Sequence, residues 1–150
     1  MNCKESTIVF ETLSGDLIVT VEGELYTLDF PSRMPLPAEL PEIISKSLSI
    51  QPKLVLKSRD YFLVYESEAD IINIKINRSI IDQINIDPGG LIITSKGTKS
   101  DFVSRFFGPA CGVNEDPVTG SAHTSLTPYW SSVLGKTTLS ALQLSQRTGS

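Results

Sequence analysis

The sequence predicts an α+β chain in which most neighbouring strands are antiparallel. Runs rich in β-branched and aromatic residues alternate with stretches of helical spacing, and the connections between them are short. The clearest helical pattern covers residues 119–134, where apolar side chains recur every three to four positions. The predicted order is strands, helix, strands, helix, strands, long helix, strand.

Three strands are predicted near the N-terminus. They cover residues 7–12, 17–21 and 25–30, and residues 13–16 form a natural hairpin connection between the first two. Closely spaced prolines follow, and these residues cannot belong to a central strand. We therefore place a lobe boundary near residues 31–37.

The middle of the chain is predicted to contain two short helices. The first covers residues 38–48, with Pro41 near its start. Residues 68–84 are ambiguous, because their isoleucines mix a period of two with a period of 3.6. A helix over residues 78–84 with Asn77 as its cap is favoured, and the part before it stays open. The remaining elements are a turn over residues 87–90 and strands over residues 53–57, 61–65, 91–95, 101–107 and 139–144.

The long helix is expected to begin near residue 120. Thr119 is a suitable N-cap, and Gly135 is a suitable C-cap. Pro128 lies inside the helix and removes the backbone hydrogen bond to the carbonyl of Thr124. We expect a kink at this proline.

The start of this helix is the best place in the sequence for chemistry. The amides of Gly120 and Ser121 have no partner within the helix, and the helix dipole adds partial positive charge, so they suit a ligand carboxylate or phosphate. Asp116 lies just upstream and can face the same spot. This arrangement suits proton transfer on a small carboxylated molecule. The alternative is that the Asp-Pro and Thr-Gly-Ser steps are an ordinary turn into a helix.

Arg105 is a second candidate for binding a carboxylate. It lies on a phenylalanine-rich strand next to the loop that precedes the long helix. The alternative is an edge arginine whose stem packs while its charged head stays in water. A nucleophilic pair of Ser121 and His123 is disfavoured, because positions i and i+2 of a helix do not face each other.

Composition limits the classes of partner. The net charge is −4 at pH 7, and lysine and arginine are scattered, which argues against nucleic acid or an anionic membrane. A small metabolite or another protein is expected. No apolar run approaches the length of a membrane helix, and the first residues lack a signal-peptide core, so we expect a cytoplasmic protein. Two cysteines and one histidine predict neither a disulfide framework nor a metal site.

Three segments of the sequence resemble the phenazine-biosynthesis PhzF family, which shares its fold with diaminopimelate epimerase. The likeness spans residues 8 to 147 and is strongest from 101 to 136. The segments are Asp101-Phe-Val-Ser-Arg-Phe-Phe-Gly-Pro-Ala-Cys-Gly-Val-Asn-Glu-Asp-Pro-Val-Thr-Gly-Ser-Ala-His123, Phe10-Glu-Thr-Leu-Ser-Gly15 and Gln143-Leu-Ser-Gln-Arg147.

The resemblance implies a fold and an activity. The family has two similar lobes, each a curved antiparallel sheet around a central helix, with the active site between them. It implies isomerisation of a small carboxylated metabolite by a proton shift without a cofactor. Asp116 and Ser121 would be catalytic, Asp116 by relaying a proton and Ser121 by assisting through its hydroxyl. The substrate-binding residues would be Thr119, Gly120, Ser121 and Arg105, whereas Glu115 is expected to be a solvated neighbour.

The resemblance also exposes a gap. Family members are nearly twice as long, and the lobe that carries their catalytic glutamate precedes the counterpart of Ile8. Residues 1–30 would be the tail of that first lobe, and residues 31–150 a second lobe that is incomplete at its C-terminus. We expect a truncated form with little activity alone, because proton shifts need groups on both sides of the migrating hydrogen. The alternative is a non-catalytic interaction module, and a homodimer or a partner protein is expected to cover exposed apolar surface.

Overall fold

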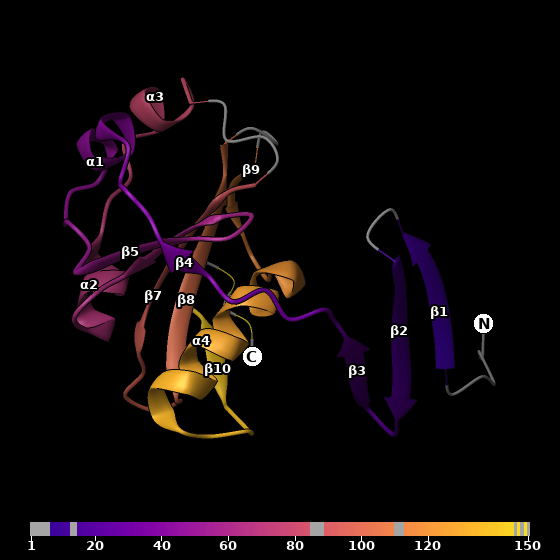
Figure 1. Ribbon diagram of the computed structural model, residues 1–150. Coiled ribbons are helices and arrows are strands. Elements are labelled where there is room, and N and C mark those ends of the chain that lie inside the picture. Colours follow the sequence, from indigo (N-terminus) through magenta and orange to yellow (C-terminus); the bar gives the residue numbers. More distant parts are fainter. Residues whose placement is uncertain are drawn as a thin grey trace. The chain divides into compact units, whose positions relative to one another are not determined.

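The computed structural model describes residues 7–12, 15–84, 89–109, 113–145, 147 and 149. The chain divides into two compact units, Met1–Ser32 and Arg33–Ser150, and each has its own sheet (Figure 1).

The first unit is a three-stranded antiparallel sheet in the order β1-β2-β3. Its strands β1 (Thr7–Thr12), β2 (Gly15–Glu22) and β3 (Leu25–Asp29) confirm the three predicted strands. Gly23 has a φ of 65°, the left-handed conformation that the tight turn between β2 and β3 requires. Residues 13–14 of the predicted hairpin connection lie outside the described residues.

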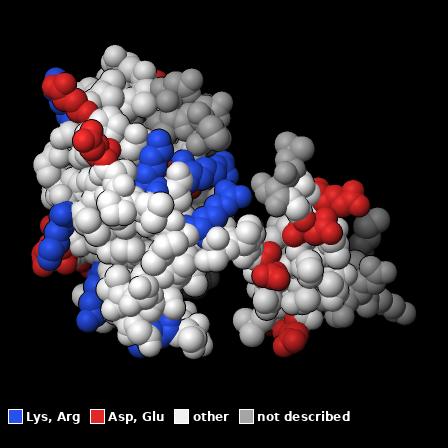
Figure 2. Space-filling model, viewed as in Figure 1, with Lys and Arg blue, Asp and Glu red and all other residues white. Residues whose placement is uncertain are grey.

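The two faces of this small sheet differ in chemistry. Side chains alternate along a strand, so the partners Ile8, Val19 and Leu28 share one face with every second residue of their strands. The apolar side chains on that face are Ile8, Phe10, Leu17, Val19, Val21, Tyr26 and Leu28. The acids on the opposite face are Glu11, Asp16, Glu22 and Asp29. Residues 7–32 contain no lysine or arginine, and the charged side chains in view on this unit are all acidic (Figure 2).

The second unit is built on a seven-stranded sheet in the order β10-β8-β7-β6-β5-β4, with β9 paired to β8. Every strand predicted from residue 53 onward is present. The strands are β4 (Leu36–Pro37), β5 (Leu54–Lys57), β6 (Tyr61–Val64), β7 (Leu91–Lys96), β8 (Phe102–Gly108), β9 (Val113–Asp116) and β10 (Ala141–Gln143). The proline-containing strand β4 lies at the edge of the sheet, where a missing N–H is tolerated.

The α+β class is confirmed, but the sheet is mixed. Four of its strand pairs are antiparallel, whereas β6 pairs with β7 and β8 pairs with β10 in parallel. Parallel neighbours need a crossover connection, and here each crossover contains helices. The connection from β6 to β7 holds α2 (Glu68–Asn73) and α3 (Arg78–Ile81), and the connection from β8 to β10 holds η2 (Gly120–Ala122) and α4 (His123–Leu134).

Helices pack against both faces of this sheet. On one face, α1 (Glu42–Ser47), α2 and α3 bury Ile44, Ile71 and Ile81 against Leu63, Leu91 and Ile93 of the strands. On the other face, α4 buries Leu126 and Trp130 against Phe62, Ile92 and Phe102. Neighbouring residues of β6 and β7 therefore enter different cores, which explains why these strands are apolar throughout.

The short helices differ from their predicted bounds. α1 is shorter than the predicted 38–48, because the chain before Pro41 pairs with β5 and Ala38 N–H donates to the carbonyl of Val55. The stretch left open holds α2, whose start is a capping box between Ser67 and Asp70. Asn77 occupies the N-cap position of α3 as predicted, although its side chain makes no cap hydrogen bond. Residues 85–88, and with them part of the predicted turn at 87–90, lie outside the described residues.

The long helix ends where it was predicted to end, but its first predicted turn is the 3-10 helix η2 and α4 itself begins at His123. Gly135 closes α4 with a φ of 65° and a ψ of 32°, which confirms the predicted left-handed C-cap. Pro128 leaves the carbonyl of Thr124 without its helical donor. The main-chain N–H of Arg33 donates to that carbonyl at 2.7 Å and replaces the missing bond.

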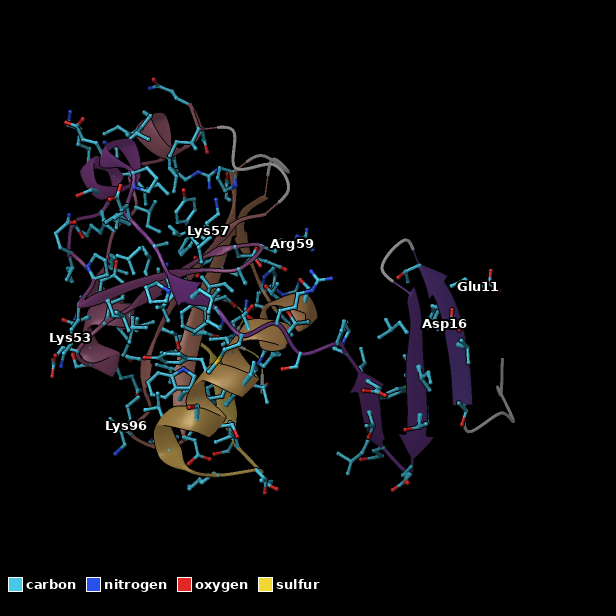
Figure 3. The ribbon with its side chains drawn as sticks, in the orientation of Figure 1. Glu11, Asp16, Lys53, Lys57, Arg59 and Lys96 are labelled. Carbon is cyan, nitrogen blue, oxygen red and sulfur yellow. The ribbon has the colours of Figure 1, made fainter. Side chains whose placement is uncertain are left out.

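A buried carboxyl group fixes the turn between β5 and β6. Asp60 is 4% exposed, and its Oδ1 accepts a hydrogen bond from Gly90 N–H at 2.7 Å. Burial raises the pKa of the Asp60 carboxyl above its ordinary value of 3.8, against the lowering effects of the Gly90 amide and of the charges on Arg59 and Arg33. Figure 3 shows Arg59 in this part of the unit.

In the part of the chain that the structure describes, none of the helices is both long and apolar enough to span a bilayer.

Candidate active site

The candidate site lies where β9 ends and the chain turns into α4. β9 pairs with β8 so that Asp116, its last residue, lies opposite Phe106, and the register shifts between Phe106 and Gly108. The turn then leads through Pro117 to Thr119. The stretch singled out in the sequence therefore joins strand β9, which was not predicted, to the predicted helix start.

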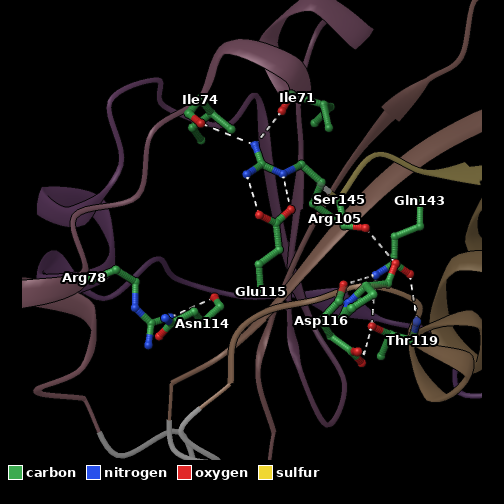
Figure 4. Close-up of polar contacts among 11 residues, drawn as sticks. Ile71, Ile74, Arg78, Arg105, Asn114, Glu115, Asp116, Thr119, Gln143 and Ser145 are labelled. Atoms are coloured by element: carbon green, nitrogen blue, oxygen red, sulfur yellow. Dashed lines mark hydrogen bonds and ion pairs between the residues drawn. The ribbon is translucent and has the colours of Figure 1, made fainter. Parts of the chain in front are cut away.

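Thr119 fixes the carboxylate of Asp116. Its hydroxyl donates to Asp116 Oδ2 at 2.7 Å (Figure 4). Thr119 occupies the cap position before η2, but its side chain does not cap the helix. The expected capping bond is thus absent, because the hydroxyl is already committed to Asp116.

Gln143 holds the same turn from β10, and sequence reasoning assigned it no role. Its Oε1 accepts from Thr119 N–H at 2.9 Å, and its Nε2 donates to the carbonyl of Asp116 at 2.6 Å and to Thr119 Oγ1 at 3.1 Å (Figure 4). Gln143 is 4% exposed, so these bonds lie away from solvent. Ser145 adds a further bond from its hydroxyl to the carbonyl of Pro117 at 2.8 Å. A signal for both residues was present in the segment Gln143-Leu-Ser-Gln-Arg147.

The start of the long helix is open to solvent. Gly120 and Ser121 are exposed, and their main-chain amides have no hydrogen-bond acceptor among the described residues. The Ser121 hydroxyl likewise has no partner in the described part of the chain, while its carbonyl accepts from Thr124 Oγ1 at 2.7 Å. Two amides and a hydroxyl are therefore available to a ligand, four and five residues beyond the fixed Asp116 carboxylate.

His123 takes no part in a Ser-His pair. Its Nδ1 lies 3.1 Å from the carbonyl of Thr119, and its ring centroid lies 6.2 Å from that of Phe102. The ring is thus directed to the protein's own turn and core. This agrees with the expectation that it does not activate Ser121.

Packing of α4 holds the helix start in place. The rings of Trp130 and Phe102 are stacked with centroids 5.9 Å apart, and Trp130 Nε1–H donates to Thr94 Oγ1 at 3.0 Å. The tilted ring pair of Tyr129 and Phe62 has a centroid distance of 5.0 Å. These contacts fix both the depth and the rotation of the helix against the sheet.

Arg105 binds a carboxylate, but that carboxylate belongs to Glu115. Its Nε and Nη2 contact the two carboxylate oxygens of Glu115 at 2.6 and 3.0 Å, and its Nη1 donates to the carbonyls of Ile71 at 2.9 Å and Ile74 at 3.4 Å. The Arg105 side chain is 15% exposed and that of Glu115 is 18% exposed. The expectation that Glu115 is a solvated neighbour is therefore wrong, because the two charges neutralise each other at the end of α2.

Consecutive residues of a strand point to opposite sides, so Glu115 and Asp116 leave β9 in different directions. Figure 4 shows Arg105 with Glu115 and, apart from them, Thr119 with Asp116 and Gln143. The structure thus brings Asp116 and Thr119 together at the helix start and holds Arg105 apart from them, with Glu115. Among the described residues, no three His, Cys, Asp or Glu side chains gather as a metal ion would require.

Comparison with known proteins gives one consistent match. The model of the PhzC-PhzF family, described as phenazine biosynthesis-like protein, matches residues 1–150. An uncharacterized isomerase of Pseudomonas aeruginosa is 44% identical over 140 residues, which cover 93% of this chain and 53% of the relative. An uncharacterized isomerase of Halalkalibacterium halodurans is 45% identical over 149 residues, which cover 97% and 56%.

Solved structures agree with these relatives. A PhzC/PhzF protein from Clostridium difficile has a TM-score of 0.88 and 42% identity, covering 99% of this chain and 57% of that structure. A PhzF-family protein from Enterococcus faecalis has a TM-score of 0.88 and 39% identity, covering 99% and 56%. The chain spans about half the length of the relatives that it matches. It belongs to the phenazine biosynthesis-like PhzC-PhzF family.

Proposed function

We propose that this chain is one half of a cofactor-independent isomerase that shifts a proton on a small carboxylated metabolite. Residues 1–30 would be the tail of a first lobe, and residues 31–150 a second lobe of the diaminopimelate-epimerase type with α4 as its central helix. The relatives from Pseudomonas aeruginosa and Halalkalibacterium halodurans carry the name isomerase, which supports the reaction class.

The observation that carries the proposal is the open helix start next to an oriented carboxylate. The unpaired amides of Gly120 and Ser121 would hold a substrate carboxylate, with the positive end of the α4 dipole behind them. Asp116, oriented by Thr119, would position the substrate and relay its proton, and the Ser121 hydroxyl would assist. Arg105 would contribute to binding through Glu115, the neighbour of Asp116 on β9.

This half supplies groups on one side of the migrating hydrogen. A proton shift needs an acid or base on the other side as well, which a complete first lobe would provide. We therefore expect very weak activity from the chain alone, in the cytoplasm, and full activity when the other half is present.

The test joins this chain to the part of the Clostridium difficile relative that the match leaves uncovered. Incorporation of solvent deuterium into a panel of small carboxylated metabolites is followed by mass spectrometry. We expect exchange in the joined protein and its loss on Asp116→Ala. Glu39→Ala removes an exposed carboxylate with no contact to the turn and serves as the matched control. Equal exchange in all three proteins would remove Asp116 from the mechanism.

A non-catalytic interaction module is the second candidate, and the apolar face of the β1-β2-β3 sheet favours it. Phe10 is 50% exposed and Tyr26 is 70% exposed on that face. Such a surface favours a homodimer or a partner protein. In concentration-dependent light scattering, Phe10→Ser should weaken self-association. Val9→Ser, which changes an exposed residue on the opposite face, should leave it unchanged. A monomer at every concentration would reject the homodimer.

A further inference from the structure

A cavity of about 460 Å³ lies in the second unit between α3, β8 and β9. Its volume falls in the range of small-molecule sites, roughly 300–1,000 Å³. Asp116, Thr119, Gly120 and Ser121 do not line it. The cavity therefore does not include the open helix start, although Arg105 and Glu115, which the proposed function links to substrate binding, line it. A ligand in this cavity would go beyond that proposed function.

The described lining residues of the cavity include the carboxylate of Glu115 and the cationic side chains of Lys75, Arg78 and Arg105. Arg105 and Glu115 neutralise each other through two short contacts. Arg78 pairs with Asp82, which does not line the cavity, and Lys75 has no ion-pair partner among the described residues.

Arg78 is held in place and retains an unused donor. Its Nη1 donates to the carbonyl of Asn114 at 2.9 Å, and its Nη2 pairs at 2.6 Å with Asp82, a half-exposed residue of the adjoining turn (Figure 4 shows the Asn114 contact). Its Nε–H is buried and has no acceptor within the described part of the chain.

Lys75 provides a second positive group on the wall of the cavity. Its ammonium group has no ion-pair partner among the described residues, and its main-chain N–H is fixed by Ser49 Oγ at 2.8 Å. Glu115 already makes the two contacts with Arg105 that a ligand carboxylate could make. The remaining donors come from two separate positions, which suits an anion with several acceptor oxygens.

We propose that this cavity binds the phosphate group of a small metabolite, with Arg78 and Lys75 as its ligands. Phosphate carries close to two negative charges near neutral pH and three acceptor oxygens, so both residues can contact it at once. Arg78 supplies a guanidinium group held in place by Asn114 and Asp82, and Lys75 supplies the second charge.

The test is a titration of the 15N-labelled chain with inorganic phosphate, followed by NMR at constant ionic strength. We expect amide shifts near Arg78, Lys75 and Asn114 that saturate with phosphate. Arg78→Gln and Lys75→Gln should each weaken binding about tenfold, as expected for the loss of one charge-assisted contact. Lys96→Gln removes the same charge at the end of β7, which Figure 3 places away from α3 in the second unit, and should bind phosphate like the parent chain.

The outcomes separate this proposal from the proposed isomerase site. The proposal is supported if the amide shifts at the cavity saturate with phosphate. Arg78→Gln and Lys75→Gln must then weaken phosphate binding while Lys96→Gln does not. Shifts confined to Gly120 and Ser121 would overturn it and would favour the open helix start as the anion site. Equal weakening by all three variants, or no saturable shift, would also overturn it. The fluorescence of Trp130, the single tryptophan, and circular dichroism report whether each variant is folded, and Lys75→Gln remains decisive if Arg78→Gln unfolds.

Discussion

The side chain of Gln143 binds Thr119 at both its backbone and its hydroxyl. Thr119 N–H donates to Gln143 Oε1 at 2.9 Å, and Gln143 Nε2 donates to Thr119 Oγ1 at 3.1 Å. The first bond fixes the backbone just before the helix start. The second leaves the Thr119 hydroxyl free to donate to Asp116. One buried amide on β10 therefore sets the geometry of the whole candidate site.

Replacing Gln143 should destabilise the second unit. Gln143→Ala leaves the buried N–H of Thr119 without an acceptor, at an expected cost of about 2 kcal/mol in the free energy of unfolding. Urea unfolding followed by Trp130 fluorescence measures it. The exposed Gln83 makes one side-chain bond to Ser79, and Gln83→Ala should cost less than about 0.5 kcal/mol. Equal costs at the two positions would contradict this account of the turn.

The hydroxyl of Thr119 should be needed for fast deuterium exchange. Thr119→Val removes the donor to Asp116, and in the joined two-lobe protein we expect the rate of deuterium exchange to fall about tenfold. Thr119→Ser keeps the donor and should retain most of the rate. Loss of exchange in both variants would show that the methyl packing of Thr119, and not its contact with Asp116, is what exchange requires.

The ion pair of Arg105 and Glu115 should contribute strongly to stability. Arg105→Met strands a largely buried carboxylate and frees two carbonyls at the end of α2, so we expect a loss of about 3 kcal/mol in the free energy of unfolding. Glu115→Gln should cost less, because an amide oxygen can still accept from Arg105. The control is Glu66→Gln, which breaks an exposed pair with Lys53 and should cost at most about 1 kcal/mol.

The amide of Arg33 should be coupled to Pro128. Arg33→Pro removes the donor to the Thr124 carbonyl and should cost about 1 kcal/mol, whereas Arg33→Ala keeps the donor and should be close to neutral. Pro128→Ala restores a helical N–H for the same carbonyl. The cost of Arg33→Pro should therefore shrink in the Pro128→Ala background. A double-mutant cycle with no coupling would show that the two donors do not share this acceptor.

Stability should depend on the titration of Asp60. Because the pKa of Asp60 is raised in the folded chain, the folded state binds this proton more readily than the unfolded state. The resulting stabilisation is complete below the ordinary value of 3.8 and is lost as the pH rises through the folded pKa. Asp60→Asn abolishes the titration.

The measurement is urea unfolding of both proteins from about pH 3 to about pH 7. The stability of the parent chain relative to Asp60→Asn should fall as the pH rises from just below 3.8. A relative stability that rises with pH would mean that the Gly90 amide and the nearby arginines outweigh burial.

The sequence patterns were sufficient for most strands and for the long helix, but not for β9 or for the bounds of the short helices. Alternation and β-branched residues located β5 to β8, and the 3.6-residue period together with Gly135 located α4. These signals are local, so they can be read without knowing the fold. The same signals placed Asp116 just before a helix, and its role in catalysis stays a prediction.

Contacts between distant segments could not be read in this way. The Thr119 side chain does not cap the helix, because its hydroxyl donates to Asp116 instead. Gln143, which binds Thr119 in this conformation, is 24 residues away along the chain. Glu115 forms an ion pair with Arg105 of the neighbouring strand instead of being solvated. The parallel pairing of β10 with β8 also depends on where the α4 crossover returns the chain, which no local pattern specifies.

The uneven faces of the β1-β2-β3 sheet have a consequence for behaviour in salt. The carboxylates on one face of this sheet repel other copies of the chain. The apolar side chains on the other face favour association with those copies. At about 1 M salt the screening length shrinks to roughly 3 Å, so the repulsion fades while the attraction persists. Clustering of this half-length chain should therefore grow with added salt, the opposite of what a contact held by opposite charges would do.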